Sequence, residues 1–187
     1  IDVMKYFAVL INLNGELEQQ AREGWQLLKQ HLSIKFISSN SPCPHITLES
    51  GFYGDQNSVL EAMSEVAKNT LPFTIKANGL GVFVQESPVI YIRWVNNKNL
   101  IQVRKALSKE LIERSRDNPT DSILGYQVNA NWVPKSTLAF KDSSYDTLPK
   151  ALRILKPLLF DFILEAKKWP YMNTPKGNLK INWLAFL

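Results

Sequence analysis

The sequence predicts an α+β fold in which helices lie outside two sheets that face each other. Apolar runs of strand length alternate with amphipathic helical segments, and the loops between them are short. One strand pattern also occurs twice: Pro-His-Ile-Thr-Leu at 44–48 returns as Pro-Lys-Ser-Thr-Leu at 134–138, ninety positions later. Two copies are too few for a repeat array, so the pattern indicates an internal duplication, with the halves dividing near residue 90.

The first three segments are separated clearly by composition. Residues 5–13 form a continuous apolar run of strand length. In the segment 15–32, apolar side chains recur every three or four positions from Leu17 to Leu32, which predicts a helix. Residues 38–44 are rich in Ser and Pro and predict a loop.

A strand at 45–52 and a second amphipathic helix at 57–70 follow, with Asn57 or Ser58 as the N-cap. Residues 73–83 alternate between apolar and polar side chains but include two glycines. Glycine inside a strand pattern is typical of a bulge, so this segment is predicted to be a bent strand.

The second half repeats the same order of elements. Residues 89–95 are rich in β-branched and aromatic side chains and predict a strand. The next segments predict a helix at 99–115, a loop at 118–127 and the strand of the second repeat at 132–140. The chain then closes with a helix at 147–159 that carries Pro149 in its first turn, and with strands at 160–169 and 180–187.

Composition indicates the cell compartment in which the protein works. Cys43 is the only cysteine, so no intramolecular disulfide can form, which fits a reducing compartment. No apolar run is long enough to span a bilayer, and the start lacks the pattern of a signal peptide. We therefore expect a cytoplasmic protein that does not enter a membrane. We also expect it to be a monomer and to use no cofactor and no metal.

Charge is distributed unevenly along the chain. Of the net charge of +5, residues 1–93 contribute −2 and residues 94–187 contribute +7. A basic half favours anionic partners such as RNA or nucleotides, although a solvated lysine-rich surface explains the charge equally well.

The repeated strand concentrates polar groups on one face. Residues i and i+2 of a strand project to the same side, so His45 and Thr47 point together, and Lys135 and Thr137 repeat that geometry. An imidazole moves protons near neutral pH and threonine hydroxyls donate hydrogen bonds to phosphoryl oxygens. If two such strands faced each other across a cleft, their four polar groups would converge on a phosphoester, and no metal would be required.

The sequences Pro-His-Ile-Thr-Leu-Glu-Ser-Gly-Phe and Val-Pro-Lys-Ser-Thr-Leu-Ala-Phe resemble the paired His-x-Thr motifs of the 2H phosphoesterase superfamily. This superfamily includes 2′-5′ RNA ligase-like proteins and cyclic nucleotide phosphodiesterases. The resemblance implies a single domain over 1–187 with two pseudo-symmetric lobes around a central cleft. It also implies that His45 is a catalytic acid or base and that Thr47 and Thr137 bind the substrate phosphate.

Lys135 stands where the resemblance predicts the second catalytic histidine. A lysine is cationic at neutral pH, so it can neutralise a phosphoryl oxygen or protonate a leaving oxygen but is a poor base. Two main interpretations stay open: a phosphodiesterase acting on 2′,3′-cyclic phosphate or 2′-5′ linked RNA or nucleotides with reduced activity, and a non-catalytic module that binds RNA ends or nucleotides. A third, weaker alternative is an interaction protein whose cleft is vestigial.

Several further side chains are weaker candidates. Arg93 and Lys141 could reach phosphates or could be ordinary surface charges. Aromatic residues near the predicted cleft strands could stack on bases, although most are expected in the core; they are Tyr53, Tyr91, Trp132, Phe140, Trp169 and Tyr171. A role for Cys43 as a nucleophile is not expected, since no third partner is evident.

Overall fold

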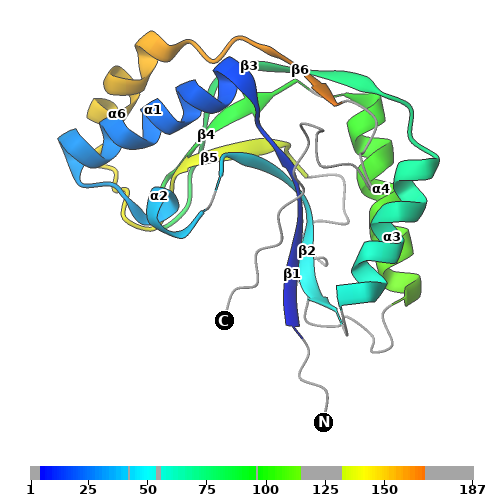
Figure 1. Cartoon of the computed structure of the whole chain (residues 1–187). Helices are drawn as coiled ribbons and strands as arrows, with labels where there is room; N and C mark the ends of the chain where they lie inside the picture. Colours follow the sequence, from blue (N-terminus) through cyan, green and yellow to red (C-terminus); the bar gives the residue numbers. More distant parts are fainter. Residues whose placement is uncertain (1–4, 42, 54–55, 96, 115–131, 167–187) are drawn as a thin grey trace.

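A computed structural model describes residues 5–41, 43–53, 56–95, 97–114 and 132–166. Within them the chain forms a mixed α+β structure with two antiparallel sheets, and a pair of helices lies at each end of the molecule (Figure 1). This confirms the predicted fold class. In the described part of the chain, no helix combines the length and the apolar character that crossing a membrane requires.

The first sheet has two strands, β1 (Lys5–Asn12) and β2 (His45–Tyr53), paired antiparallel. The helices α3 (Gln56–Lys68) and α4 (Lys98–Arg114) pack against each other and contact β2. Both helices begin and end close to their predicted bounds. Helix α3 begins at Gln56, so Asn57 and Ser58 lie in its first turn and neither is the N-cap.

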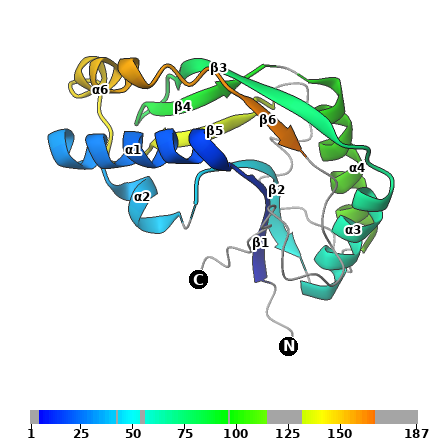
Figure 2. The same ribbon diagram turned by 45° about the horizontal axis from the view of Figure 1, so that its top comes forward.

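The second sheet has four strands in the order β5-β4-β3-β6, and all of its pairs are antiparallel. Helix α1 contacts β5 and α6, and the two helices lie side by side at the end of the molecule away from α3 and α4 (Figure 2). The elements are β5 (Lys135–Ala139), β4 (Val89–Trp94), β3 (Phe73–Phe83), β6 (Ile163–Ala166), α1 (Gly15–Leu32), α6 (Leu148–Leu155) and the 3-10 turn η1 (Lys156–Leu158).

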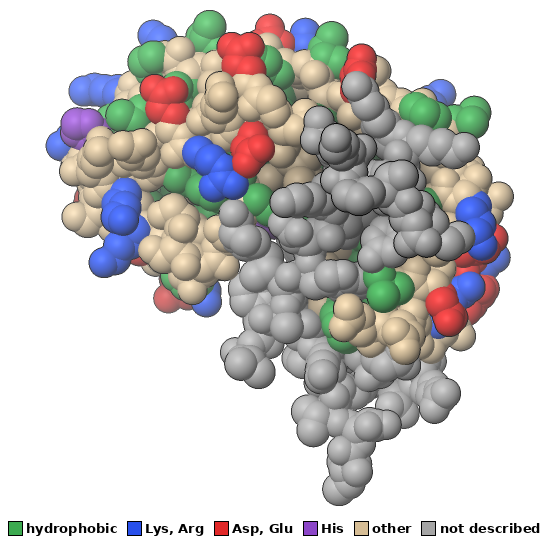
Figure 3. All heavy atoms as spheres, in the orientation of Figure 1, with side chains coloured by type: hydrophobic (Ala, Val, Ile, Leu, Met, Phe, Trp, Pro, Cys, Tyr) green, Lys and Arg blue, Asp and Glu red, His purple; other side chains and the backbone are tan. Residues whose placement is uncertain are grey.

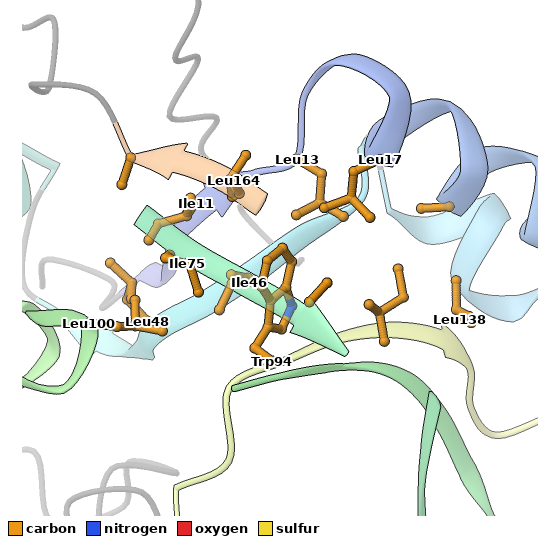
Figure 4. Packing of buried hydrophobic residues seen from close by; sticks show 14 of the residues in the cluster. Ile11, Leu13, Leu17, Ile46, Leu48, Ile75, Trp94, Leu100, Leu138 and Leu164 are labelled. Carbon is orange, nitrogen blue, oxygen red and sulfur yellow. The ribbon is translucent and has the colours of Figure 1, made fainter. Parts of the chain in front are cut away.

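One hydrophobic core runs through both sheets. Ile46 of β2 lies in the same buried cluster as Ile75 of β3 and Trp94 of β4 (Figure 4). Leu17 of α1 and Leu100 of α4 join this cluster from the two helix pairs. Because the cluster is continuous, the sheets are held to each other by apolar burial, which is the main source of folding free energy.

The glycines at 79 and 81 serve two different purposes in β3. The register between β3 and β4 shifts between Ala77 and Leu80, so the predicted bulge is confirmed, and Gly79 adopts a φ of 70° there. At Gly81 a Cβ atom would overlap the ring of Tyr91 on the neighbouring strand. Gly79 therefore supplies backbone freedom, whereas Gly81 supplies space.

The predicted loop at 38–44 is wrong in part, because α2 (Phe36–Asn40) occupies its beginning. The carboxylate of Asp142 accepts hydrogen bonds from the backbone N–H groups of Lys35 and Phe36, both at 2.7 Å. This contact caps the helix from a position more than 100 residues away, a partner that no local pattern reveals. The predicted loop 118–127 and strand 180–187 lie outside the described residues.

A buried ion pair joins α4 to β2. The Arg104 guanidinium lies 3.0 Å from the Glu49 carboxylate, and its Nε atom donates to the carbonyl of Leu48 at 3.1 Å. Glu49 is 0% exposed. Burial raises the pKa of Glu49 to about 7, while the charge of Arg104 and the hydroxyl of Ser108 oppose that rise.

This burial predicts a pH dependence of stability. Between pH 4.5, the ordinary pKa of Glu49, and about 7, the folded protein holds a proton that the unfolded chain has released. The free energy of unfolding should therefore fall as the pH rises through this window, by up to about 3 kcal/mol. Glu49→Gln, which cannot ionise, should lose this part of the dependence in urea unfolding measured at several pH values.

Arg104→Lys is the matched control for this experiment. It keeps a cation beside Glu49, so it should retain the pH dependence while losing the hydrogen bond to Leu48 and some stability at every pH. If Glu49→Gln and the wild type show the same change in unfolding free energy with pH, the assignment to Glu49 is wrong.

Candidate functional site

The two repeats adopt the same alternation of buried and partly exposed side chains. Ile46 and Leu48 of β2 are fully buried, as are Ser136 and Leu138 of β5. The residues that alternate with them are half-buried; these are His45, Thr47, Lys135 and Thr137. In each strand the buried neighbours therefore fix the polar pair on the opposite face.

The repeats also share a bulge at the same position. Leu10 pairs with Thr47 but Val9 pairs with Glu49, so Leu48 is the extra residue of β2. On β5, Tyr91 pairs with Thr137 but Ile90 pairs with Ala139, so Leu138 is extra there. Bulges re-aim neighbouring side chains and are frequent beside active sites. The similarity of the repeats thus extends beyond their sequence to an irregularity of the backbone.

His45 and Lys135 lie near each other where β2 contacts β5. Burial is the main cause that lowers the pKa of His45; the carbonyl of Cys43 opposes this effect, and the positive charge of Lys135 lowers the pKa further. Such an electrostatic effect requires proximity in a partly buried environment. The structure therefore brings the distinctive residue of one repeat close to that of the other.

Contacts with Ser41 and Cys43, just before β2, orient the imidazole. The Nδ1 atom of His45 lies 2.9 Å from the carbonyl oxygen of Cys43 and 3.4 Å from Oγ of Ser41. The Ser41 hydroxyl itself donates to that carbonyl at 3.0 Å, so Nδ1–H is the natural donor to both oxygens. In the neutral imidazole this leaves Nε2 unprotonated and able to accept a proton.

Lys135 and Thr137 are held by contacts on β5. The Nζ atom of Lys135 donates to Oγ1 of Thr137 at 3.3 Å, and burial lowers the pKa of Lys135. The carbonyl of Thr137, on the edge strand of the sheet, accepts a hydrogen bond from the indole of Trp25 at 3.2 Å. The ammonium and the hydroxyl thus lie together on a strand whose backbone is tied to α1.

Sequence reasoning did not find Ser41 or the carbonyl of Cys43 as the partners of His45. A serine four residues before a histidine is a weak signal, and a carbonyl group leaves no trace in the sequence. Cys43 is buried, and its thiol donates to Asn12 at 3.2 Å, which agrees with its expected lack of nucleophilic character.

The aromatic candidates mostly have structural partners. Tyr91 is 7% exposed and packs on Phe83 with ring centroids 4.4 Å apart. Trp132 lies under the Arg104 guanidinium, and the ring of Phe140 meets that of Phe36 edge to face. The side chain of Tyr53 lies outside the described part of the structure, and so do the whole of Trp169 and Tyr171.

Charged groups are mixed on the surface. On the face shown in Figure 3, the Lys and Arg side chains of the described residues lie among Asp and Glu and do not gather into one patch. Lys141 lies over the ring of Phe36, with Nζ 4.7 Å from the ring centroid. Among the described residues, no three His, Cys, Asp or Glu side chains are grouped so that they could hold a metal ion.

Comparison with known proteins identifies the family of the chain. Residues 17–172 match the family model of the 2′-5′ RNA ligase superfamily, so the chain belongs to this family of 2H phosphoesterases. No curated protein matches the chain.

Solved structures with a similar fold include E. coli LigT without ligand, at 19% identity and a TM-score of 0.47 over 75% of this chain and 74% of that one. E. coli LigT complexed with ATP matches at 17% identity and a TM-score of 0.46, over 76% and 75% of the two chains. Usb1 of Kluyveromyces marxianus matches at 10% identity and a TM-score of 0.41, over 87% and 91%.

The proximity of the two repeats predicts an electrostatic coupling. Lys135→Met keeps a long unbranched side chain but removes the charge that lowers the pKa of His45, so that pKa should rise. The titration can be followed by NMR of the imidazole signals, with His31→Gln to assign the other histidine.

Lys141→Met is the matched control, because it removes a different cation from the segment that follows β5. It should leave the pKa of His45 where it is in the wild type. An unchanged pKa of His45 in Lys135→Met would contradict the placement of the two side chains beside each other.

Proposed function

We propose that the chain acts on phosphate esters at RNA ends or in nucleotides, either 2′,3′-cyclic phosphates or 2′-5′ linkages, bound between β2 and β5. Its membership of the 2′-5′ RNA ligase superfamily supports the reaction class. The observation that carries the proposal is the contact between β2 and β5, because these are the strands that carry the polar pairs of the two repeats. The effect of the Lys135 charge on the pKa of His45 supports the same proximity.

In the proposed reaction on a cyclic phosphate, water attacks phosphorus while Nε2 of His45 accepts its proton. The bond between phosphorus and one ribose oxygen breaks, and the ammonium of Lys135 gives that oxygen a proton. The hydroxyls of Thr47 and Thr137 donate to the other phosphoryl oxygens. The product is a phosphate monoester, and the proton on His45 returns through solvent to Lys135. The scheme uses no metal ion and no cofactor.

The electrostatics of the two groups support this division of roles. The lowered pKa of His45 keeps its imidazole neutral at neutral pH, as a base must be. The lowered pKa of Lys135 makes its ammonium a better acid than an exposed lysine, although a bound phosphate would oppose that shift. Turnover should therefore need a pH above the pKa of His45 and below that of Lys135.

A non-catalytic module that binds RNA ends or nucleotides is the second candidate. The presence of Lys135 favours it, since an ammonium that donates to Thr137 can serve as a phosphate cradle without transferring a proton. Both candidates use the same residues, and they differ only in whether a bond is broken.

We further propose that residues 1–187 form one domain of two pseudo-symmetric lobes, that it works as a monomer, and that it is cytoplasmic. The twin bulges at Leu48 and Leu138 support the internal symmetry. The single free cysteine supports a reducing compartment.

Turnover of 2′,3′-cyclic nucleotides and 2′-5′ dinucleotides tests the proposal directly. Lys135→His supplies an imidazole with an ordinary pKa near 6.5, and turnover should rise by roughly 10²-fold, with a bell-shaped pH profile. His45→Ala in the Lys135→His background should abolish the gain, and Lys135→Ala should weaken anion binding without adding activity.

The same experiment separates the two candidates. Slow turnover by the wild type that His45→Ala removes supports the phosphodiesterase. Nucleotide binding without turnover, in both the wild type and folded Lys135→His, supports the binding module alone. If neither substrate binds to the wild type, the proposed function is wrong.

A further inference from the structure

The strand β4 presents a second cation beside the candidate site. Arg93 pairs in register with Lys135 on β5, and Tyr91 pairs with Thr137 two residues away. Residues directly opposite each other on antiparallel strands point to the same face. Arg93 and Lys135 are therefore neighbours on the face that also carries Thr137.

Two like charges in this arrangement are unfavourable unless an anion lies near them. Directly opposed charges of one sign destabilise a strand pair. Two other cations close to the sheets do have carboxylate partners: Arg104 pairs with Glu49, and Lys76 with Asp161. Within the described residues, neither Arg93 nor Lys135 forms a salt bridge.

The bulge of β3 holds Arg93 away from Lys135. The extra residue between Ala77 and Leu80 leaves the carbonyl of Asn78 opposite Arg93, whose Nε atom donates to it at 3.0 Å. Gly79, with a φ of 70°, makes this bulge possible. The guanidinium thus leans towards β3, on the side of β4 away from β5.

Among the described residues, the only recorded hydrogen bond of the Arg93 guanidinium is the one to Asn78, which leaves its other donors for a ligand. Arg93 is exposed, and a guanidinium carries five N–H donors, of which the contact with Asn78 uses one. Burial raises the pKa of Tyr91 and the charge of Arg93 opposes the rise, which places that charge over the same face. A planar fork of donors matches the oxygens of a phosphate group.

We propose that Arg93 forms a second phosphate subsite, which binds a phosphate group of the substrate other than the one held by His45 and Lys135. This inference rests on the proposed function and narrows its substrate class to RNA ends or nucleotides that carry at least two phosphates. The bulge at Asn78 and Gly79 separates the two subsites, because it draws the guanidinium towards β3.

Calorimetric titration with three ligands tests the subsite. Adenosine 3′-monophosphate carries one phosphate, adenosine 3′,5′-bisphosphate adds a terminal phosphate, and the adenylyl dinucleotide with a 3′-phosphate adds an internucleotide phosphodiester. The wild type should bind at least one of the two-phosphate ligands about tenfold more tightly than the monophosphate. The ligand that binds more tightly than the monophosphate shows whether the second phosphate of the substrate is terminal or internucleotide.

Arg93→Gln should remove that gain and leave the affinity for the monophosphate unchanged. Arg93→Lys keeps a point charge and should retain part of the gain. Lys76→Gln is the matched control, because it removes an exposed cation from the adjacent strand β3, and it should leave all affinities as in the wild type.

The outcomes distinguish this inference from the proposed function. If the wild type binds the monophosphate but gains nothing from a second phosphate, or if the gain survives in Arg93→Gln, the subsite is wrong and the proposed function stands. If Arg93→Gln weakens all three ligands equally, Arg93 contacts the reacting phosphate and the subsite is again wrong. If no ligand binds to the wild type, both fail.

Discussion

The burial of alternate side chains on β2 and β5 is the constraint on which the rest of the site depends. Ile46 and Leu48 lie in the continuous core, as does Leu138, so the strands cannot slip by one residue without exposing apolar surface. That register leaves His45 and Lys135 on the faces opposite the core. The hydrophobic effect supplies no chemistry here, but it decides where the imidazole and the ammonium can point.

The exchange of an imidazole for an ammonium changes what the pair can do. Two imidazoles would be interchangeable as acid and base, whereas His45 and Lys135 are not, because their pKa values are lowered from very different starting points. The hydrogen bond from Nδ1 of His45 to the carbonyl of Cys43 reinforces this asymmetry by leaving Nε2 as the proton acceptor. In the proposed reaction the pair would therefore transfer protons in one direction only, and in the proposed binding module it would hold an anion without any proton transfer.

The sequence predicted most elements because their signals are local. Helix α1 begins and ends at Gly15 and Leu32 as expected, since its apolar spacing is regular. Helix α2 was missed because its cap, Asp142, comes from the other repeat. The four candidate site residues were found through the repeat, but the orienting contacts of His45 and the bulges at Leu48 and Leu138 depend on strand pairing, which the sequence does not display.

A crystal structure of the protein with adenosine 3′-monophosphate would test the central claim most directly, namely that the two repeats form one phosphate site. We predict that the phosphate lies between β2 and β5, within hydrogen-bonding distance of Nε2 of His45 and Nζ of Lys135, with at least one of the two threonine hydroxyls donating to it. A phosphate bound at a remote surface, or His45 and Lys135 found on different surfaces, would contradict it.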